Sequence, residues 1–285
     1  MKLISYSMKG EAGVGAVVGE GVVDLGRRLG EKFGTMKSLI SQGDLTEVKG
    51  AVERAEPDYR YDEVTLLPVV PDASKIVCIG LNYKAHAAET TRDPNDKPML
   101  FARWADTLIA HKAPLVQPRI SQMLDYEAEM LTVIGSHTGR NVKAADALKY
   151  VFGYSCMNEG SVRDWQRHSS QVTAGKNFVG TGATGPWIVT ADEIPDPQVL
   201  DIDLTVNGEP RQTANTRDMI WSVAEMIEYI TNWMPLGPGD LIATGTPAGV
   251  GSMRKPPIFL QPGDKVEVTI NGIGTLSNIV EAENA

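Results

Sequence analysis

The 285-residue sequence contains few of the residue types on which several classes of protein depend. Its only two cysteines, Cys78 and Cys156, each lie in an apolar run typical of a strand. Two buried free thiols in a reducing compartment are therefore expected, and a catalytic cysteine is the alternative. A chain of this length buries enough surface to fold without a disulfide or a structural metal.

Long apolar runs and a surplus of positive charge are also missing. No segment approaches the roughly 20 apolar residues of a membrane span, and the start of the chain lacks an apolar stretch of signal-peptide length. The 27 basic and 36 acidic residues give a formal net charge of −9, which argues against wholesale nucleic-acid binding. These absences predict a cytoplasmic protein whose partner is neither a membrane nor a nucleic acid. They do not argue against a small anionic metabolite as the ligand.

Glycine and proline divide the remaining sequence into short segments. Residues 1–70 predict a small N-terminal α+β domain. It is expected to end in an extended connector, because Pro68 and Pro71 exclude a helix there. Within this domain, strands are expected at residues 2–7 and 15–25, and one or two helices at 37–55.

Residues 71–285 predict a second domain that is mostly β. Asn-Gly pairs at Asn207 and Asn271 are hairpin signals. Because the strands do not alternate regularly with helices, a doubly wound parallel sheet is not expected. Strands are expected at residues 75–83, 99–104, 107–111, 129–135, 151–157, 185–190, 201–208, 240–245, 265–270 and 275–281.

Two main helices are expected in this second domain. The first covers residues 161–169, where Ser161 and Asp164 have the spacing of a capping box. The second covers residues 218–234, which carry apolar side chains at helical spacing. The whole chain is therefore expected to be mixed α+β and mostly β, with few helices.

The most informative segment is the acidic run at residues 124–135. On a strand, Glu127 and Glu129 point to the same face, with Asp125 in line behind them. Like charges on one face repel each other, so their surroundings should offset this repulsion. A solvated face with lysines opposite would do so, and so would a hard divalent cation. Ligands that are all oxygen suit Mg²⁺, Mn²⁺ or Ca²⁺.

Further charged residues follow the next apolar strand. Glu159 stands between that strand and the helix at 161–169, where it could complete an acidic cluster or lie on a surface loop. Arg163 and Gln166 would share a helix face, and the arginine could bind a substrate carboxylate with two hydrogen bonds. Lys176 lies in a glycine-containing turn and could hold an oxyanion. Exposed surface positions are the alternative for both cations.

One histidine has a partner at helical spacing. His86 and Glu89 are three residues apart, so one helical turn would bring them together. A glutamate that orients an imidazole raises its basicity and makes the pair a candidate general base for activating water. A structural histidine is the alternative.

Taken in order, these motifs resemble the fumarylacetoacetate hydrolase family. The resemblance rests on G-L-N-Y-x-x-H-x-x-E at 80–89, D-Y-E-x-E at 125–129, N-x-x-S-x-R-D-x-Q at 158–166 and the P-G-D-L-I-A-T-G-T-P run from 238. It covers about residues 72–281, and both the order and the spacing of the motifs fit.

The resemblance implies a rolled, barrel-like β-sheet, a homodimer, and Mg²⁺ or Mn²⁺ as cofactor. By position, Glu127 and Glu129 match two metal ligands. Glu159 falls where the family usually has aspartate as the third ligand. Glutamate is longer by one methylene, so the metal or the strand would have to shift. The other implied site residues are catalytic His86, Glu89 and Lys176, and substrate-contacting Arg163, Gln166 and Thr246.

The activity that this resemblance implies is hydrolysis of a carbon–carbon bond in a 2,4-dioxo acid. The substrate would be an acylpyruvate or a 2,4-diketo-3-deoxy sugar acid, and the products pyruvate and a second carboxylic acid. The alternative on the same scaffold is a 2-oxo acid decarboxylase, or an isomerase or tautomerase of the 5-carboxymethyl-2-hydroxymuconate or 2-hydroxyhepta-2,4-diene-1,7-dioate type. A catalytically silent metal-carboxylate binding protein is disfavoured, because it would be free to lose the lysine, the arginine or the His–Glu pair.

Substrate specificity is expected to lie in three segments, at residues 90–97, 167–173 and 253–257. Within or beside them, Arg92, Arg254 and Lys255 are candidates to meet a second carboxylate, or else are solvated.

Overall fold

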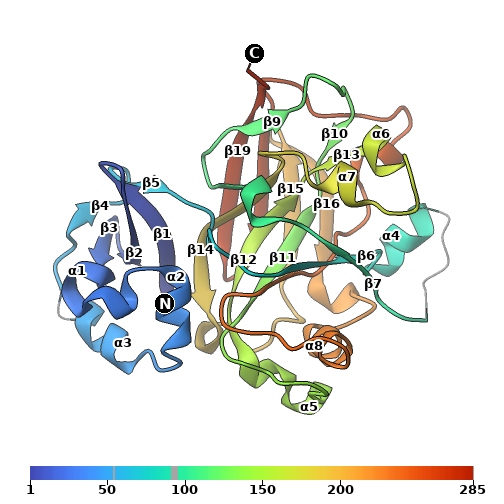
Figure 1. Cartoon of the computed structure of the whole chain (residues 1–285). Helices are drawn as coiled ribbons and strands as arrows, with labels where there is room; N and C mark the ends of the chain where they lie inside the picture. Colours follow the sequence, from blue (N-terminus) through green and yellow to red (C-terminus); the bar gives the residue numbers. More distant parts are fainter. Residues whose placement is uncertain (54, 91–95, 285) are drawn as a thin grey trace.

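The computed structural model describes residues 1–53, 55–90 and 96–284, and in it strands dominate while the helices are short (Figure 1). This confirms the mixed α+β class that is mostly β. The cysteines at 78 and 156 are buried free thiols, as expected. In the described part of the chain, no helix has both the length and the apolar character needed to cross a membrane.

A twelve-stranded sheet runs through the whole molecule. Its strand order is β4-β3-β2-β1-β14-β12-β11-β17-β6-β7, with β5 paired to β1 and β8 to β14. The strands are β1 (Lys2–Met8), β2 (Glu11–Val18), β3 (Gly21–Asp24), β4 (Tyr59–Arg60), β5 (Thr65–Leu66), β6 (Ile76–Gly80), β7 (Met99–Ala102), β8 (Leu108–Ala110), β11 (Ala128–Ile134), β12 (Val151–Glu159), β14 (Gly182–Thr190) and β17 (Leu241–Ala243).

A five-stranded sheet, ordered β16-β15-β18-β19-β9, packs against β11, β12 and β14. The main apolar core lies between the two sheets and contains Met130, Ile202 and Val268. The predicted hairpin at Asn207 joins β15 to β16, and Asn207 and Gly208 both have the positive φ that a type I′ turn requires. The remaining strands are β9 (Leu115–Gln117), β15 (Asp201–Val206), β16 (Glu209–Asn215), β18 (Lys265–Ile270), β19 (Gly274–Ala282), and the separate pair β10 (Leu124–Asp125) and β13 (Ser161–Val162).

Helices of the N-terminal segment pack on the face of the large sheet that points away from the five-stranded sheet, where Phe33, Leu39 and Val48 share an apolar core with Leu131 and Ile188. Two helices are present at residues 37–55, where one or two were expected, and α1 was not predicted. The α-helices are α1 (Leu25–Leu29), α2 (Met36–Ser41), α3 (Thr46–Glu53), α4 (Lys84–Glu89), α5 (Ala144–Ala147), α6 (Arg163–Gln166), α7 (Thr173–Lys176) and α8 (Val223–Thr231). The 3-10 turns are η1 (Glu31–Phe33), η2 (Ala105–Thr107), η3 (Leu148–Tyr150), η4 (Ala191–Glu193), η5 (Thr216–Asp218) and η6 (Gly251–Met253).

Two predicted helix boundaries were wrong. Ser161 does not cap α6, because it is paired in β13 and its hydroxyl donates to Glu127 Oε1 and to the Glu159 carbonyl. Asp164 instead accepts from the Ser121 hydroxyl. The second helix begins only after Ser222, whose side chain forms the capping box with Glu225 that was expected of the other helix.

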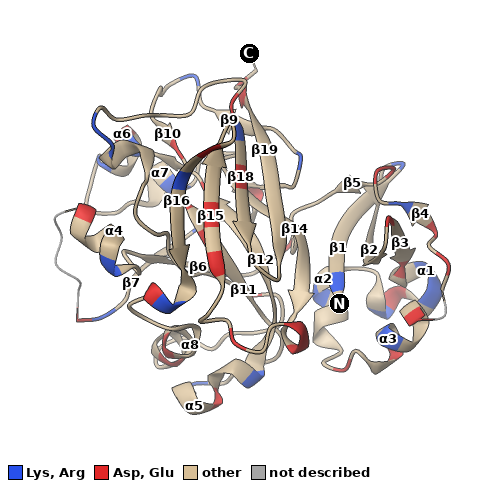
Figure 2. Ribbon diagram, turned by 180° about the vertical axis from the view of Figure 1, so that it is seen from behind, with Lys and Arg blue, Asp and Glu red and all other residues tan. Residues whose placement is uncertain are grey.

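The N-terminal strands continue the large sheet. β1 pairs antiparallel with β14, so β2, β3 and β4 extend the sheet beyond the core, as both ribbon views show (Figures 1 and 2). The backbone N–H of Val69 also donates to the Thr184 hydroxyl in β14. The division into residues 1–70 and 71–285 stays a prediction.

Candidate metal centre and active site

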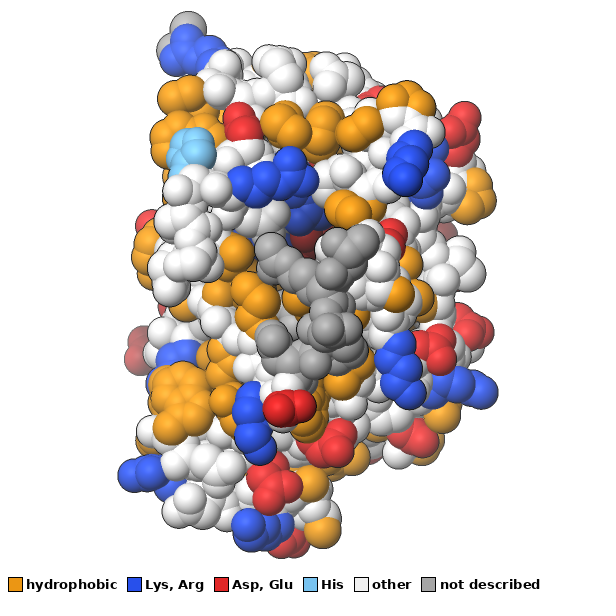
Figure 3. All heavy atoms as spheres, turned by 90° about the vertical axis from the view of Figure 1, so that its right-hand side faces the viewer, with side chains coloured by type: hydrophobic (Ala, Val, Ile, Leu, Met, Phe, Trp, Pro, Cys, Tyr) orange, Lys and Arg blue, Asp and Glu red, His pale blue; other side chains and the backbone are white. Residues whose placement is uncertain are grey.

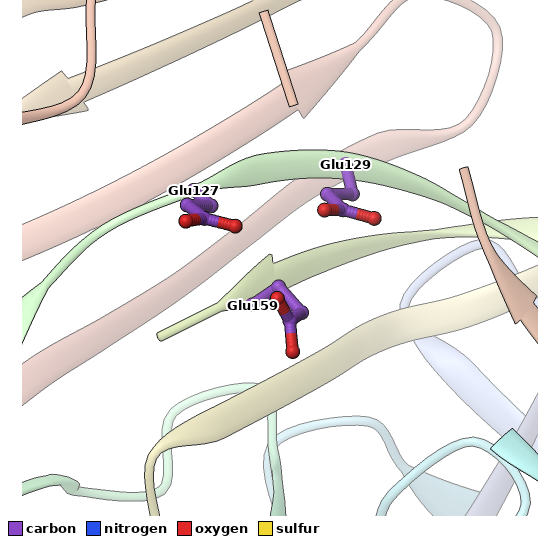
Figure 4. Close-up of side chains that lie close together, drawn as sticks. All are labelled: Glu127, Glu129 and Glu159. Atoms are coloured by element: carbon purple, nitrogen blue, oxygen red, sulfur yellow. The ribbon is translucent and has the colours of Figure 1, made fainter. Parts of the chain in front are cut away.

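Three glutamates meet where β11 and β12 run side by side (Figure 4). Glu127 lies in the short break between β10 and β11, Glu129 is on β11, and Glu159 ends β12. The register is fixed locally, because the Glu159 N–H donates to the Glu127 carbonyl at 2.9 Å. One carboxylate oxygen from each residue lies within 4.8 Å of the others, and all three residues are buried. The structure thus brings together the three predicted ligands.

Buried cations surround two of these carboxylates. Lys176 donates to Glu127 Oε2 at 2.7 Å and also to Glu159 Oε2. Arg163 Nη1 lies 2.7 Å from Glu127 Oε1, and Arg103 Nη1 donates to Glu159 Oε1 at 3.0 Å. Burial alone raises the pKa of the Glu127 carboxyl, but the charges of Lys176 and Arg163 outweigh it and hold that pKa well below its usual range.

The third carboxylate, Glu129, has a different environment. It accepts a hydrogen bond from the Gly245 N–H at 2.8 Å, and no Lys, Arg or His of the described residues forms an ion pair with it. Burial, and then repulsion from Glu159 and Glu127, raise the pKa of Glu129 well above its usual value. The cluster therefore has one carboxylate that lacks a counter-ion and lies beside two further carboxylate oxygens, which is the donor set that a hard divalent cation prefers.

Asp125 is not part of the triad but shares Arg163 with it. It accepts from Arg163 Nε at 2.7 Å and from the N–H groups of Gly251 and Ser252. Because the strand is interrupted after Asp125, this carboxylate does not continue the alternation of the two glutamates. Its role is to hold Arg163 and the turn at residues 251–253 beside the triad.

A cavity of about 440 Å³ opens onto the triad. Figure 3 shows the face that carries it, where basic side chains lie over a recessed acidic patch. Of the predicted site residues, those lining the cavity are His86, Glu127, Glu129, Arg163, Gln166, Lys176 and Thr246. Glu159 and Glu89 stand behind this surface and contact residues that line it.

The predicted His–Glu pair is formed on α4. The Nδ1 atom of His86 lies 2.6 Å from Glu89 Oε1, and both carboxylate oxygens of Glu89 accept from the Gly249 N–H. A carboxylate at Nδ1 stabilises the tautomer with its proton on that nitrogen, which leaves Nε2 as the basic atom. The pair therefore has the geometry of a general base beside the cavity.

The cations of the site have fixed positions. Arg163 Nη1 donates to Gln166 Oε1 at 3.0 Å, so the predicted helix-face pair is present. Its Nη2 atom is buried and has no partner among the described residues. Burial lowers the pKa of Lys176, but Glu127 and Glu159 outweigh this effect and raise it. These two carboxylates therefore favour the charged form of Lys176.

The expected specificity segments divide into those at the cavity and those away from it. Thr90, Arg167 and Met253 line it, together with Ser169, Ser170 and Val172. Arg254 does not, because its guanidinium donates to the Tyr126 hydroxyl and to the Arg211 carbonyl. Lys255 is exposed and also lies outside the lining. Residues 91–95, with Arg92, lie outside the described residues.

Arg103 is the main site residue that sequence reasoning missed. It is buried, and it donates to Glu159 Oε1 and to the Thr181 hydroxyl. A signal was present, because it is the only charged residue of the apolar run at 99–104. The residue after Glu159 must be glycine, since a Cβ at Gly160 would lie 2.1 Å from the Thr181 carbonyl oxygen.

Comparisons with known proteins agree with this geometry. Residues 75–281 match the model of the fumarylacetoacetate (FAA) hydrolase C-terminal family. The bovine (Bos taurus) mitochondrial oxaloacetate tautomerase FAHD2A is 37% identical over 266 residues, which cover 92% of this chain and 84% of that protein. The chain therefore belongs to the fumarylacetoacetate hydrolase family, as its motifs indicate.

Two solved structures illustrate the likeness in three dimensions. Maleylpyruvate hydrolase from Sphingobium sp. SYK-6, in complex with manganese(II) and pyruvate, has a TM-score of 0.83 and 30% identity, with both chains fully covered. The 2-hydroxyhepta-2,4-diene-1,7-dioate isomerase from Mycobacterium marinum has a TM-score of 0.77 and 31% identity, also with both chains fully covered. The family thus contains hydrolases, isomerases and tautomerases, and the chain is an enzyme of this family.

Proposed function

We propose that the protein is a Mg²⁺- or Mn²⁺-dependent hydrolase of the carbon–carbon bond between C3 and C4 of an acylpyruvate-type 2,4-dioxo acid. The observation that carries the proposal is that His86 of the His–Glu pair lines the same cavity as Glu127 and Glu129 of the buried carboxylate triad. A divalent ion held by Glu127, Glu129 and Glu159 would polarise the 2-oxo group and favour the enolate leaving group.

The residues of the chain supply the remaining chemistry. His86 Nε2 takes a proton from water while Glu89 stabilises the imidazolium, and the water oxygen bonds to C4. The C3–C4 bond then breaks, its electron pair remains on C3, and proton transfer gives pyruvate and a carboxylic acid. Lys176 stabilises negative charge on the reacting oxygens. Arg163, Gln166 and Thr246 bind and orient the substrate.

Tautomerisation of a 2-oxo acid such as oxaloacetate is the second candidate. It is favoured by the 37% identity to the bovine oxaloacetate tautomerase. This reaction removes the proton of the C2 hydroxyl of the enol and adds one at C3, so that C2=C3 becomes a single bond, C2=O forms and no carbon–carbon bond is cleaved. The same cavity and the same base would serve it. The cation at the triad and the cationic side chains around it would stabilise the enolate in both reactions.

A product assay distinguishes the two candidates. The wild-type protein is given a panel of 2,4-dioxo acids and, separately, freshly dissolved enol-oxaloacetate, with Mn²⁺ or Mg²⁺ and with a chelator. Metal-dependent release of pyruvate from a dioxo acid supports the hydrolase. Accelerated decay of the enol with no cleavage of any dioxo acid supports the tautomerase. No metal-dependent turnover of either kind would support the silent binding protein.

We further propose that the protein is a homodimer and cytoplasmic. Large apolar side chains exposed on the surface, among them Trp104, Ile120 and Val179, are compatible with a partner subunit. The mass measured by light scattering tests the dimer. The bovine relative is mitochondrial by name, so fractionation of the source cell is the test of location.

A further inference from the structure

A buried glutamine links the strand of the glutamates to the threonine that lines the cavity. Gln212 is on β16 in the five-stranded sheet, and only 2% of the residue is exposed. Its Oε1 accepts from the Ala128 N–H at 2.8 Å. Its Nε2 donates to Thr246 Oγ1 at 2.8 Å and to the Pro247 carbonyl at 2.7 Å. All the hydrogen-bond partners of this side chain thus belong to the site or adjoin it in sequence.

The orientation of the Gln212 amide is determined by its neighbours. The Ala128 N–H can only donate, so it must face the amide oxygen. The Pro247 carbonyl can only accept, so it must face the amide nitrogen. A flipped amide would place two donors against each other and two acceptors against each other in a buried position, which is costly. Both hydrogens of the NH₂ group are therefore committed, one to Pro247 and the other to Thr246.

This arrangement fixes the direction of the Thr246 hydroxyl hydrogen. The amide nitrogen has no lone pair to offer, so Thr246 can only accept from Gln212. Thr246 Oγ1 donates to no acceptor among the described residues, and Thr246 lines the cavity. Its hydrogen is therefore available to an acceptor inside the cavity. Accepting one hydrogen bond also makes the hydroxyl a stronger donor.

We propose that Gln212 is a positioning residue that makes Thr246 a dedicated hydrogen-bond donor to a carboxylate oxygen of the substrate. It acts through Thr246 and does not touch the substrate. Its bond to Ala128, which lies between Glu127 and Glu129, fixes the distance between this donor and the carboxylate triad. The inference rests on the proposed function, because it assumes a 2-oxo acid with its carboxylate beside Thr246.

The test measures binding of pyruvate to the Mn²⁺-loaded protein, and Mn²⁺ affinity alone, so it needs no turnover. In Gln212→Glu, one carboxylate oxygen still accepts from the Ala128 N–H. The other oxygen replaces the NH₂ donor that faced Thr246, so the threonine hydroxyl donates to it and no longer into the cavity. We expect pyruvate to bind about tenfold to a hundredfold more weakly, the range for one hydrogen bond to a charged group. Thr246→Val should have a similar effect. Mn²⁺ affinity should change less than about twofold in Thr246→Val, and Gln212→Glu, which adds a negative charge beside the triad, should not weaken it.

A double-mutant cycle separates positioning from a general structural effect. If Gln212 acts through Thr246, the double variant should bind pyruvate no more weakly than Thr246→Val alone. Thr246→Ser, which keeps the hydroxyl, should bind like the wild type. If the glutamate variant fails to fold, Gln212→Met removes the donor without adding a charge or an acceptor, and pyruvate should then bind about twofold to tenfold more weakly, the range for one neutral hydrogen bond.

Two results would overturn the inference. One is unchanged pyruvate affinity in a folded Gln212 variant, and the other is an additive loss in the double variant. Either result leaves the proposed function intact. Failure of the wild-type protein to bind pyruvate in the presence of Mn²⁺ would overturn the proposed function as well.

Discussion

At the scale of single residues, Glu127 and Glu129 are chemically identical but have opposite electrostatic surroundings. Glu127 is neutralised by Lys176 and Arg163, whereas Glu129 has no cationic partner among the described residues. The same substitution, Glu→Gln, should therefore have opposite effects on the metal-free protein. Glu129→Gln removes a repelled charge and should raise the free energy of unfolding. Glu127→Gln leaves two buried cations short of a partner and should lower it by about 3 kcal/mol.

The pH dependence of the free energy of unfolding also follows from the surroundings of Glu129. The folded-state pKa of Glu129 is raised, so its stabilising contribution is present below its unfolded pKa, near 4.5, and is lost as pH rises through the folded value. The wild-type metal-free protein should therefore lose this part of its stability with rising pH, and Glu129→Gln should not. Urea unfolding at several pH values measures the difference. Equal pH dependence of the two proteins would contradict the assignment.

A second prediction at this scale concerns the base. His86→Ala should reduce hydrolysis of a dioxo acid by about 10²- to 10⁴-fold, the usual contribution of a positioned general base. Decarboxylation of oxaloacetate needs no attacking water, so the variant should retain most of that activity if the wild type has it. Glu89→Gln is the matched control and should show a smaller loss, since the imidazole is kept. Hydrolysis at the wild-type rate by His86→Ala would refute the assignment of His86 as the general base.

Spacing on a strand and on a helical turn could predict that Glu127 and Glu129 share a face and that His86 meets Glu89, whereas Glu159 was assigned as the third ligand by the family resemblance. Spacing could not predict the partners of these residues. Arg103, which follows β7, reaches Glu159 across 56 positions of sequence, and Gln212 reaches Thr246 from the other sheet. Such contacts depend on tertiary packing, which leaves no periodic signal in the sequence.

At the scale of elements, two serines with the same local pattern behave differently. Ser161 and Ser222 both stand three residues before an acidic side chain, yet only Ser222 caps its helix. The hydroxyl of Ser161 is used by Glu127 and by the Glu159 carbonyl, and its backbone is paired in β13. A local propensity was thus overridden by contacts with the site, which explains why the first predicted capping box was wrong.

This difference gives a matched pair of variants. Ser222→Ala should lower the free energy of unfolding by about 1 kcal/mol, the usual cost of a lost N-cap, with Mn²⁺ affinity unchanged. Ser161→Ala should instead weaken Mn²⁺ binding, because it frees the Glu127 carboxylate from one of its fixed contacts. Chemical denaturation and calorimetric titration of both variants test this pair. A loss of metal affinity in Ser222→Ala would contradict the view that Ser222 affects only the stability of the helix and Ser161 the metal centre.

At the scale of the whole molecule, the strands and their turns were largely predictable, and the sheet arrangement was not. Short apolar runs bounded by glycine and proline marked most strands, and the Asn-Gly pair at 207 marked a hairpin correctly. Nothing local indicated that β1 pairs with β14, where Lys2 is opposite Val189, or that β17 lies between β6 and β11. Non-local pairing joins the two predicted domains into one sheet.

That continuity predicts a single cooperative unfolding transition. β1 is bonded to β14, and the Ser5 hydroxyl donates to the Val69 carbonyl beside the same strand. β14 also pairs with β12, which carries Glu159. Stabilisation at the metal centre should therefore reach the N-terminal strands. Mn²⁺ at a hundred times its Kd should add about 2.7 kcal/mol to the free energy of unfolding.

Hydrogen exchange measured by mass spectrometry provides the readout, because it reports residues 1–70 and 71–285 separately. We expect slow exchange in β1 and β2 to become slower with Mn²⁺, in parallel with β11 and β12. The Glu129→Gln variant is the control and should show no such change. If the peptides of β1 and β2 were indifferent to Mn²⁺ while those of β11 and β12 were protected, the N-terminal strands would unfold independently. The continuous sheet would then be a structural contact without thermodynamic coupling.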